Sequence, residues 1–463
     1  MRKDCGNIKN KTNIIIETKP LYRTLIKLAL PIAAQSLISS TLNLVDNLMV
    51  GSIGEAELAA VGIATQLFFV HWMLMYGFTS GSATFMAQFW GAKNLGNIRK
   101  TTGFAISICG SISLIFFAFA FFVPRVVLSV FTDIPLIIDL GEGYVQVVAL
   151  TLLLVSITVP FTAALRVTHQ THIPLIISLF VFSTNTFLNY VLIFGKFGAP
   201  QMGVTGAGVA TLIARTLEFI LIMFMVFGRK NIISGKLKEF FSWTKEFTKR
   251  VLNNAIPTTV NETMWGLGTA MYVAAYARMG ITEFAAVQAS NTINQLFIMV
   301  AFSMGDAALI MVGQKIGEGK LDYSYFLAKR LLKIGTLIGV VMGFLLIILS
   351  KPLISLFGFT PEGEKYAFII LIIYGAVMGL QLYTGMNIVG ILRAGGDTKF
   401  AMFTEGGSIW LIGVPIAFLG ALVFQFPIYI VVALVKLEEV AKFFVLRKRF
   451  KSGKWINNVI NKL

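Results

Sequence analysis

A carboxylate interrupts an apolar stretch near the start of the chain, in the segment LNLVDNLMV at 42–50. Asp46 is the only acidic residue between Leu25 and Val50. Asn43 lies three residues before Asp46 and four before Asn47, so in a helix the three polar side chains cluster around one face. Apolar surroundings disfavour the ionised form of a carboxyl group. The pattern indicates either a group that takes up and releases a proton or cation, or a neutral acid held by polar neighbours for packing.

Two more acids lie within apolar segments of the second half of the chain. Glu262 stands in PTTVNETMWGLG, five residues after Pro257, and Asp306 stands in FSMGDAALIM. An ionisable side chain in hydrocarbon is costly unless it has a partner or faces water, so such residues are candidates for function. We expect Glu262 and Asp306 to act in cation coupling or in attracting a cationic substrate.

Two charge pairs are spaced for a structural role instead. Arg215 and Glu218 are three residues apart, and so are Lys436 and Glu439, a spacing that places oppositely charged side chains side by side on a helix. We predict an ion pair at each. The motif HQTH has no other His or Cys nearby, so we expect no metal site there.

The segments that carry these residues are those of a membrane protein. The 463 residues are 56% hydrophobic and 13% charged, whereas soluble proteins carry about 25% charged residues. A helix that crosses a bilayer needs about 20 mostly apolar residues. Segments of that kind are found twelve times, at 25–50, 57–89, 101–123, 137–165, 172–194, 206–227, 251–277, 284–313, 331–350, 366–391, 400–423 and 425–446. They are too long and too uniformly apolar for barrel strands.

The distribution of basic residues gives an orientation to the twelve helices. If both termini are cytoplasmic, 33 of the 39 Lys and Arg residues fall on inner segments or helix ends, five fall on outer loops, and Arg215 remains inside a helix. Basic loops resist translocation. Membrane topology therefore accounts for the net charge of +17, and we expect no nucleic-acid partner. We predict a multi-pass protein of the cell membrane with both termini inside.

The two halves of the sequence are related. A shift of 226 residues aligns Pro31 with Pro257, Gln88 with Gln314 and Gly91 with Gly317, and a shift of 227 aligns Arg166 with Arg393. Because each half has six helices, both start on the same side of the membrane and form parallel repeats. The predicted organisation is a polar tail (1–24), an N-lobe (25–227), a basic linker (228–250), a C-lobe (251–446) and a basic tail (447–463). Pro31 is expected near the start of its helix, and both prolines are candidate bending points.

The sequence resembles the multidrug and toxic compound extrusion (MATE) transporters from about Leu28 to Arg449. The resemblance rests on LALPIAAQSLISSTLNLVDNLMVGSIGEAELAAVGIA, GFTSGSATFMAQFWGAKN, FGAPQMGVTGAGVAT, VGQKIGEG and ILRAGGDT. It implies an all-α fold with two six-helix lobes around a central cleft. It also implies export of organic cations or drug-like compounds in exchange for H⁺ or Na⁺, with no cofactor and with membrane lipid as surroundings. We expect a monomer.

The resemblance also implies a cation pocket in the N-lobe, lined by Asp46, Asn185, Asn189 and Thr211. Related transporters commonly have Asp where this chain has Asn189, so one carboxylate remains. A hard cation prefers several anionic or carbonyl oxygens, which favours H⁺ over Na⁺ as the coupling ion, and any Na⁺ would bind at Asp46. For the two asparagines, hydrogen bonding between helices is the alternative.

Other functions fit the sequence less well. A flippase for a lipid-linked precursor, the main alternative, is expected to place basic residues in its cleft for pyrophosphate, and Arg215 is the one basic residue expected deep in a helix. A membrane-embedded enzyme needs a sizeable catalytic loop, and the longest polar loop, at 228–250, has no such constellation. The sequence also lacks a phosphate-binding loop with Lys and Ser or Thr. We expect a transporter that is not an enzyme.

Overall fold

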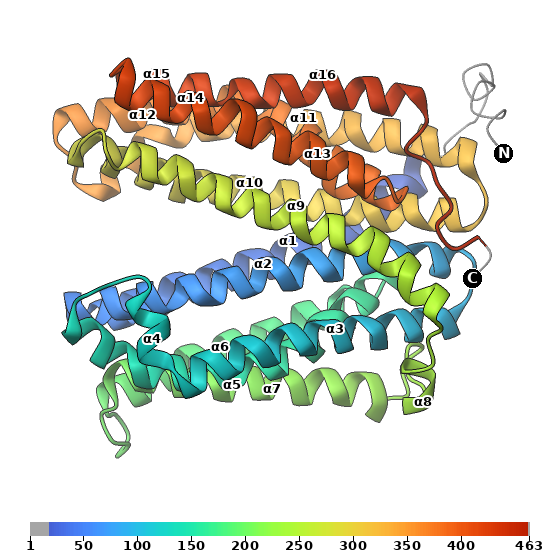
Figure 1. The fold of residues 1–463 in the computed structure, drawn as a ribbon, viewed down its shortest axis with the longest axis horizontal. Helices are drawn as coiled ribbons and strands as arrows, with labels where there is room; N and C mark the ends of the chain where they lie inside the picture. Colours follow the sequence, from blue (N-terminus) through green and yellow to red (C-terminus); the bar gives the residue numbers. More distant parts are fainter. Residues whose placement is uncertain (1–17, 462–463) are drawn as a thin grey trace. The chain divides into compact units, whose positions relative to one another are not determined.

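The computed structural model describes residues 18–461, and within this range all regular structure is helical. Two compact units follow the two halves of the chain. From here on, the name N-lobe refers to residues 30–86 and 94–252, the unit that the structure defines, in place of the expected range 25–227. The C-lobe consists of residues 253–461 with the short segments 18–29 and 87–93, which belong to the first two helices. Figure 1 labels the helices and colours them along the sequence, from blue at the N-terminal end to red at the C-terminal end.

The first half of the chain contains long apolar helices joined by short turns. Asn94 caps α3 by accepting a hydrogen bond from the Asn97 backbone N–H over 3.0 Å, and Gly195 ends α6 in the left-handed conformation that glycine tolerates. The elements are α1 (Thr18–Gly51), α2 (Glu55–Gly91), α3 (Leu95–Phe122), α4 (Pro124–Ser129), α5 (Pro135–Val167), α6 (His172–Phe194), α7 (Gly203–Met223), η3 (Phe224–Gly228) and α8 (Leu237–Phe240).

The second half repeats this arrangement, but its last helices are interrupted. π-helical turns divide the segment at 398–423 into four pieces, and a turn at Lys436 separates the final two helices. The elements are α9 (Lys245–Tyr276), α10 (Ile281–Gly317), α11 (Leu321–Ile354), η4 (Ser355–Phe357), α12 (Pro361–Gly385), η5 (Met386–Leu392), α13 (Thr398–Ser408), η6 (Ile409–Gly413), α14 (Val414–Phe418), η7 (Leu419–Val423), α15 (Ile428–Val435) and α16 (Leu437–Ser452).

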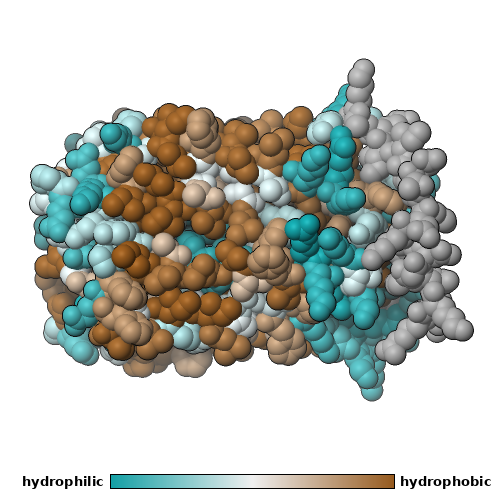
Figure 2. Space-filling view, turned by 90° about the horizontal axis from the view of Figure 1, so that it is seen from above, coloured by the Kyte–Doolittle hydropathy of each residue, from teal (hydrophilic) through white to brown (hydrophobic). Residues whose placement is uncertain are grey.

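Ten helices within the described residues are long and apolar enough to cross a membrane, and they match ten of the twelve expected segments. The other two expected segments correspond to α9, which carries several polar residues, and to α15 with α16. The helices are longer than the expected apolar segments, since polar residues at their ends are also helical. Figure 2 shows hydrophobic side chains over the middle of the helices and hydrophilic ones toward their ends. The prediction of an all-α membrane fold is confirmed.

Pro31 lies deeper in its helix than the sequence indicated. We expected it near the helix start, but α1 begins at Thr18. The polar residues before the apolar run are also helical, so the helix starts well before Pro31 and the proline does not mark its beginning. Pro257 is likewise inside α9. Each proline removes a backbone hydrogen bond within a continuous helix, which keeps both positions as candidate bending points.

Small residues bring α11 and α12 close together in the C-lobe. A Cβ atom added to Gly343 would strike the backbone of Gly375, and a Cβ added to Gly339 would crowd Gly379. Membrane helices associate by such close packing, because lipid tails give no hydrophobic drive for helices to pair. The glycines therefore let the backbones of α11 and α12 approach closely.

Candidate functional sites

The predicted pocket residues of the N-lobe form one chain of hydrogen bonds. Asn189 Nδ2 donates to Asp46 Oδ1 over 2.5 Å and to Asn185 Oδ1 over 3.0 Å, and Asn185 Nδ2 donates to Thr211 Oγ1 over 3.3 Å. These contacts join α1, α6 and α7. The one-turn spacing of the asparagines puts both amides on the face of α6 that meets the other two helices.

The hydrogen-bonded residues of the N-lobe are not equally buried. Asn185 and Asn189 are almost fully buried, whereas Asp46 is only half-buried. Among the described residues, Asn189 Oδ1 has no hydrogen-bond partner although it is buried. A buried amide oxygen without a partner is costly. Together with the Asp46 carboxylate, it forms an oxygen set that can accept a proton donor or a cation.

Asn43 and Asn47 do not join this cluster. Both side chains are exposed on α1, so the polar group expected around Asp46 is supplied by α6 and not by the same helix.

The ion pair predicted on α7 is present. Arg215 Nη1 contacts Glu218 Oε2 over 2.7 Å, and Arg215 also lies within electrostatic reach of Asp46. The N-lobe thus places a permanent cation, already bound to an acid, near the carboxylate that is the candidate for protonation.

The corresponding prediction for the C-lobe is wrong. Lys436 lies over the ring of Tyr374, 4.9 Å from its centroid, and Glu439 pairs with Lys442 instead, at 2.8 Å. The reason is the turn at Lys436, which lies between α15 and α16. The helical spacing that would align Lys436 with Glu439 does not apply across this break.

Glu262 of α9 has a specific basic partner. Arg393, at the end of η5, forms a buried ion pair with it. In the N-lobe the repeat-related Arg166 of α5 donates to Gln35 Oε1 of α1 over 2.7 Å. The same long-range contact therefore occurs in both repeats, with a charged acceptor only in the C-lobe. Asp306 is half-buried on α10, and its functional role stays a prediction.

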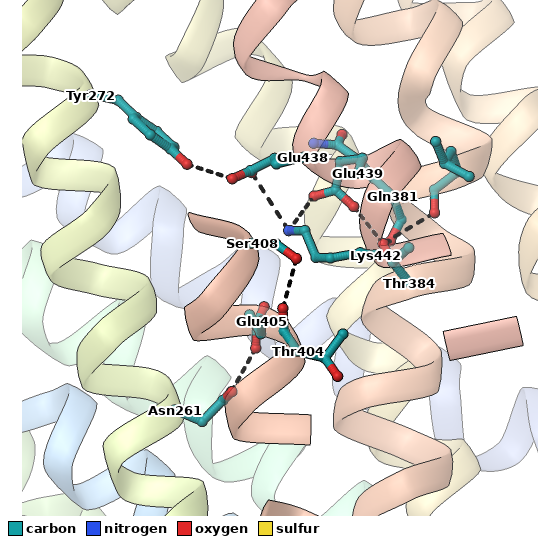
Figure 3. A network of polar contacts seen from close by, with 11 residues as sticks. Asn261, Tyr272, Gln381, Thr384, Thr404, Glu405, Ser408, Glu438, Glu439 and Lys442 are labelled. Atoms are coloured by element: carbon teal, nitrogen blue, oxygen red, sulfur yellow. Dashed lines mark hydrogen bonds and ion pairs between the residues drawn. The ribbon is translucent and has the colours of Figure 1, made fainter. Parts of the chain in front are cut away.

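A second buried polar network of the C-lobe is centred on Lys442 (Figure 3). Lys442 Nζ lies 2.8 Å from Glu439 Oε1 and 3.5 Å from Glu438 Oε1. The second carboxylate oxygen of each acid accepts a hydrogen bond from a hydroxyl group. The Thr384 hydroxyl donates to Glu439 over 2.6 Å, and the Tyr272 hydroxyl donates to Glu438 over 2.5 Å. All three charged residues are at least 93% buried, so their mutual neutralisation is what makes this burial tolerable.

Glu405 of α13 stands at the edge of this network. It accepts a hydrogen bond from Asn261 Nδ2 over 2.6 Å, and the charged groups around it are Lys442, Glu262 and Arg393. The π-helical turn η6 begins directly after α13, and such turns are frequent at functional sites. The described part of the C-lobe therefore gathers three buried carboxylates, of Glu262, Glu438 and Glu439, and the half-buried carboxylate of Glu405 around the cations of Arg393 and Lys442.

The sequence did not reveal either basic partner as part of a site. The distribution of Lys and Arg counts Arg393 and Lys442 among the inner segments and helix ends, and it leaves Arg215 as the one basic residue expected deep in a helix. Both are buried instead. Within residues 18–461, no three His, Cys, Asp or Glu residues gather as a metal site.

This arrangement, two lobes of apolar helices that each enclose polar and ionisable groups, is that of a membrane transporter. The family model described as MatE matches the chain twice, at residues 31–191 and 255–419. The two matches start 224 residues apart, at 31 and 255, which is close to the 226-residue shift that relates the two halves of the sequence. The chain belongs to the MatE family, whose members are transporters and not enzymes.

Relatives cover nearly the whole chain. A probable multidrug resistance protein NorM of Thermotoga maritima is 26% identical over 411 residues, 88% of each protein. An uncharacterized transporter YisQ of Bacillus subtilis is 24% identical over 95% of this chain and 96% of its own length. A multidrug resistance protein MdtK of Yersinia enterocolitica is 24% identical over 86% of this chain.

Solved structures confirm the fold. A crystal structure of MATE in complex with MaL6 superposes with a TM-score of 0.85 over 94% of this chain and 97% of that one, at 16% identity. An outward-facing multidrug resistance MATE family transporter gives a TM-score of 0.82 over 96% of this chain, also at 16% identity. The two-lobe architecture predicted from the repeats is therefore that of these transporters.

Proposed function

We propose that the protein is a secondary active antiporter that exports organic, drug-like cations in exchange for H⁺. The observation that carries this proposal is the chain of hydrogen bonds that joins Asp46, Asn189, Asn185 and Thr211 across three helices of the N-lobe. Relatives that cover most of the chain are named multidrug resistance proteins, which supports drug-like compounds as substrates. The location is the cell membrane, with both termini cytoplasmic, and the working unit is a monomer.

Asp46 is the group that changes charge in this proposal. Ionised Asp46 accepts the hydrogen bond from Asn189 and requires a cation or water on its half-exposed side. Protonated Asp46 becomes a donor, and the free Asn189 Oδ1 is a buried acceptor that lacks a partner among the described residues. The two protonation states thus favour different contacts between α1 and α6. A ligand shifts an equilibrium only by its different affinity for two states, and this difference supplies the coupling.

The oxygen set favours a proton over Na⁺. One carboxylate, amide oxygens and one hydroxyl gather at the N-lobe site, whereas hard cations are held best by several anionic or carbonyl oxygens. A proton needs only the single carboxylate. Exchange for Na⁺ at Asp46 remains the second possibility, and the experiment below separates the two.

The buried basic residues argue against the lipid-linked precursor flippase. A pyrophosphate is bound by charge-assisted hydrogen bonds from basic side chains. Arg215, Arg393 and Lys442 each contact an acid of their own lobe. These cations are already neutralised, which supports export of cations more than of anionic lipid precursors.

The test is transport by the purified protein in proteoliposomes. A proton gradient and a sodium gradient are imposed separately, and the movement of ethidium or norfloxacin is followed. The proposal expects movement driven by the proton gradient, and little with sodium alone. Movement driven only by sodium would replace H⁺ with Na⁺, and no movement of either compound under both gradients would contradict drug antiport.

A further inference from the structure

The described part of the C-lobe contains a pocket that the transport cycle proposed above does not use. It has a volume of about 320 Å³ and lies among α11, α12 and α16. These helices pack together, with α12 between the other two. Its charged lining residues are Lys329 and Lys333 of α11 and Arg447 and Lys451 of α16, and no acidic side chain lines it.

The four cations of this basic pocket lack the partners that other basic residues of the lobe have. Within residues 18–461, none of them forms an ion pair with a carboxylate, and all four side chains are exposed. The guanidinium of Arg447 lies over the ring of Phe443, 5.6 Å from its centroid. Four like charges around one pocket repel one another, so an anion bound there would relieve that repulsion.

An apolar stripe continues from the pocket along each of the two helices. On α11, Leu337, Val340 and Phe344 follow Lys329 and Lys333 at helical spacing and are exposed by 64%, 56% and 64%. The surface of a spanning helix that is apolar and exposed faces lipid chains. The cations of α11 therefore stand where its lipid-facing surface meets the headgroup region.

The final helix mirrors this arrangement. Val440 and Phe444 are exposed by 39% and 64%, and they precede Arg447 and Lys451 on the same helix. The cations lie in the early turns of α11 and in the last turns of α16. Both are the ends that the distribution of Lys and Arg assigns to the cytoplasmic side.

We propose that this pocket binds the phosphate of an anionic phospholipid from the inner leaflet, with the acyl chains along the apolar stripes of α11 and α16. The ligand has the two features that the surface demands, a negative headgroup and an attached hydrocarbon chain. Basic pockets between membrane helices on the cytoplasmic side are suited to such headgroups. A free phosphate would satisfy the cations but would leave the apolar stripes without a role.

The occupied site would brace the buried network of the lobe. Tyr383 of α12 lines the pocket, and the next residue, Thr384, donates to Glu439 of α16. A lipid bound against α11, α12 and α16 would therefore support the contact between α12 and α16 at Thr384 and Glu439.

The experiment measures lipid binding by native mass spectrometry on the full chain in detergent, titrated with dioleoyl phosphatidylglycerol or dioleoyl phosphatidylcholine. The test variant is Lys333→Gln with Arg447→Gln. The matched control is Arg330→Gln with Lys448→Gln, which removes the same charges from exposed positions of the same helices that do not line the pocket. At roughly 1 kcal/mol per basic residue, the test variant loses affinity by about 30-fold, and the control keeps it within a few-fold.

Three results would overturn the proposal. Equal losses in the test and control variants would mean diffuse attraction to the whole basic surface. Equal binding of phosphatidylcholine would remove the role of the negative headgroup. Displacement of the lipid by millimolar glycerol 3-phosphate would identify a site for soluble phosphates instead. Unfolding midpoints, recorded for both variants, confirm that the exposed substitutions leave the fold intact.

Discussion

Arg393 and Glu262 form a buried ion pair that joins η5 to α9. The equivalent position of the first repeat has Arg166 bound to the neutral side chain of Gln35. The repeat therefore conserves an arginine that reaches to the first helix of its lobe, and the C-lobe adds a carboxylate. The charge of Glu262 is compensated by Arg393, which separates it from Asp46, whose hydrogen-bond partner is the amide of Asn189.

Glu262→Gln tests how much this pair stabilises the C-lobe. Removing one member of a buried pair leaves the other charge uncompensated and costs about 3 kcal/mol or more, so the thermal unfolding midpoint of the purified protein falls clearly. Replacing both residues, as Glu262→Met with Arg393→Met, restores most of the loss because neither charge remains. Gln35→Leu in the N-lobe serves as the uncharged control and costs less. An unchanged midpoint for Glu262→Gln would show that the pair is not formed.

Lys442→Met tests the network of Figure 3. The variant leaves Glu438 and Glu439 as buried neighbours without a cation, so we expect a loss of stability of about 3 kcal/mol or more. The combined variant Lys442→Met with Glu439→Gln recovers part of it, since one uncompensated acid is gone. The measurement is again the unfolding midpoint. If Lys442→Met is as stable as the unaltered protein, Lys442 is not the cation that holds these acids.

Gly91 and Gly317, equivalent in the two repeats, allow α2 and α10 to pack closely. A Cβ atom on Gly91 would strike the Gln314 backbone, and one on Gly317 would strike the Gln88 backbone. Gly91→Ala is therefore expected to lower both stability and the yield of inserted protein, because backbone atoms cannot move aside cheaply. Gly62→Ala in the same helix α2 meets open space and stabilises by up to about 1 kcal/mol through helix propensity. Equal effects of the two substitutions would contradict the close packing.

The proposed topology is tested by introduced cysteines in a background of Cys5→Ser and Cys109→Ser. Cysteines in place of Glu55 and Glu364, which are exposed at the starts of α2 and α12, should react with an impermeant thiol reagent added outside intact cells. A cysteine in place of Lys238, exposed on α8, should react only after the membrane is opened. The reverse labelling pattern would place both termini outside.

The fold was predictable because apolar length and basic loops are local properties of the sequence. The pocket of Asp46, Asn185, Asn189 and Thr211 was expected from the family resemblance, and the structure joins all four residues. The partners of Glu262 and Glu439 were not expected. Arg393 is 131 residues from Glu262, a distance that no helical spacing reveals. The break at Lys436 separated two residues that a continuous helix would have paired.

The central claim is that the charge of Asp46 couples drug movement to protons. The measurement that tests it most directly is proton-driven efflux of ethidium from proteoliposomes by Asp46→Asn, compared with the unaltered protein at equal insertion. Asparagine keeps an oxygen that accepts from Asn189 but cannot titrate. We predict a folded, inserted protein that retains drug binding and has lost proton-driven efflux. Efflux at the unaltered rate would show that Asp46 is a packed polar residue and would contradict the proposed coupling.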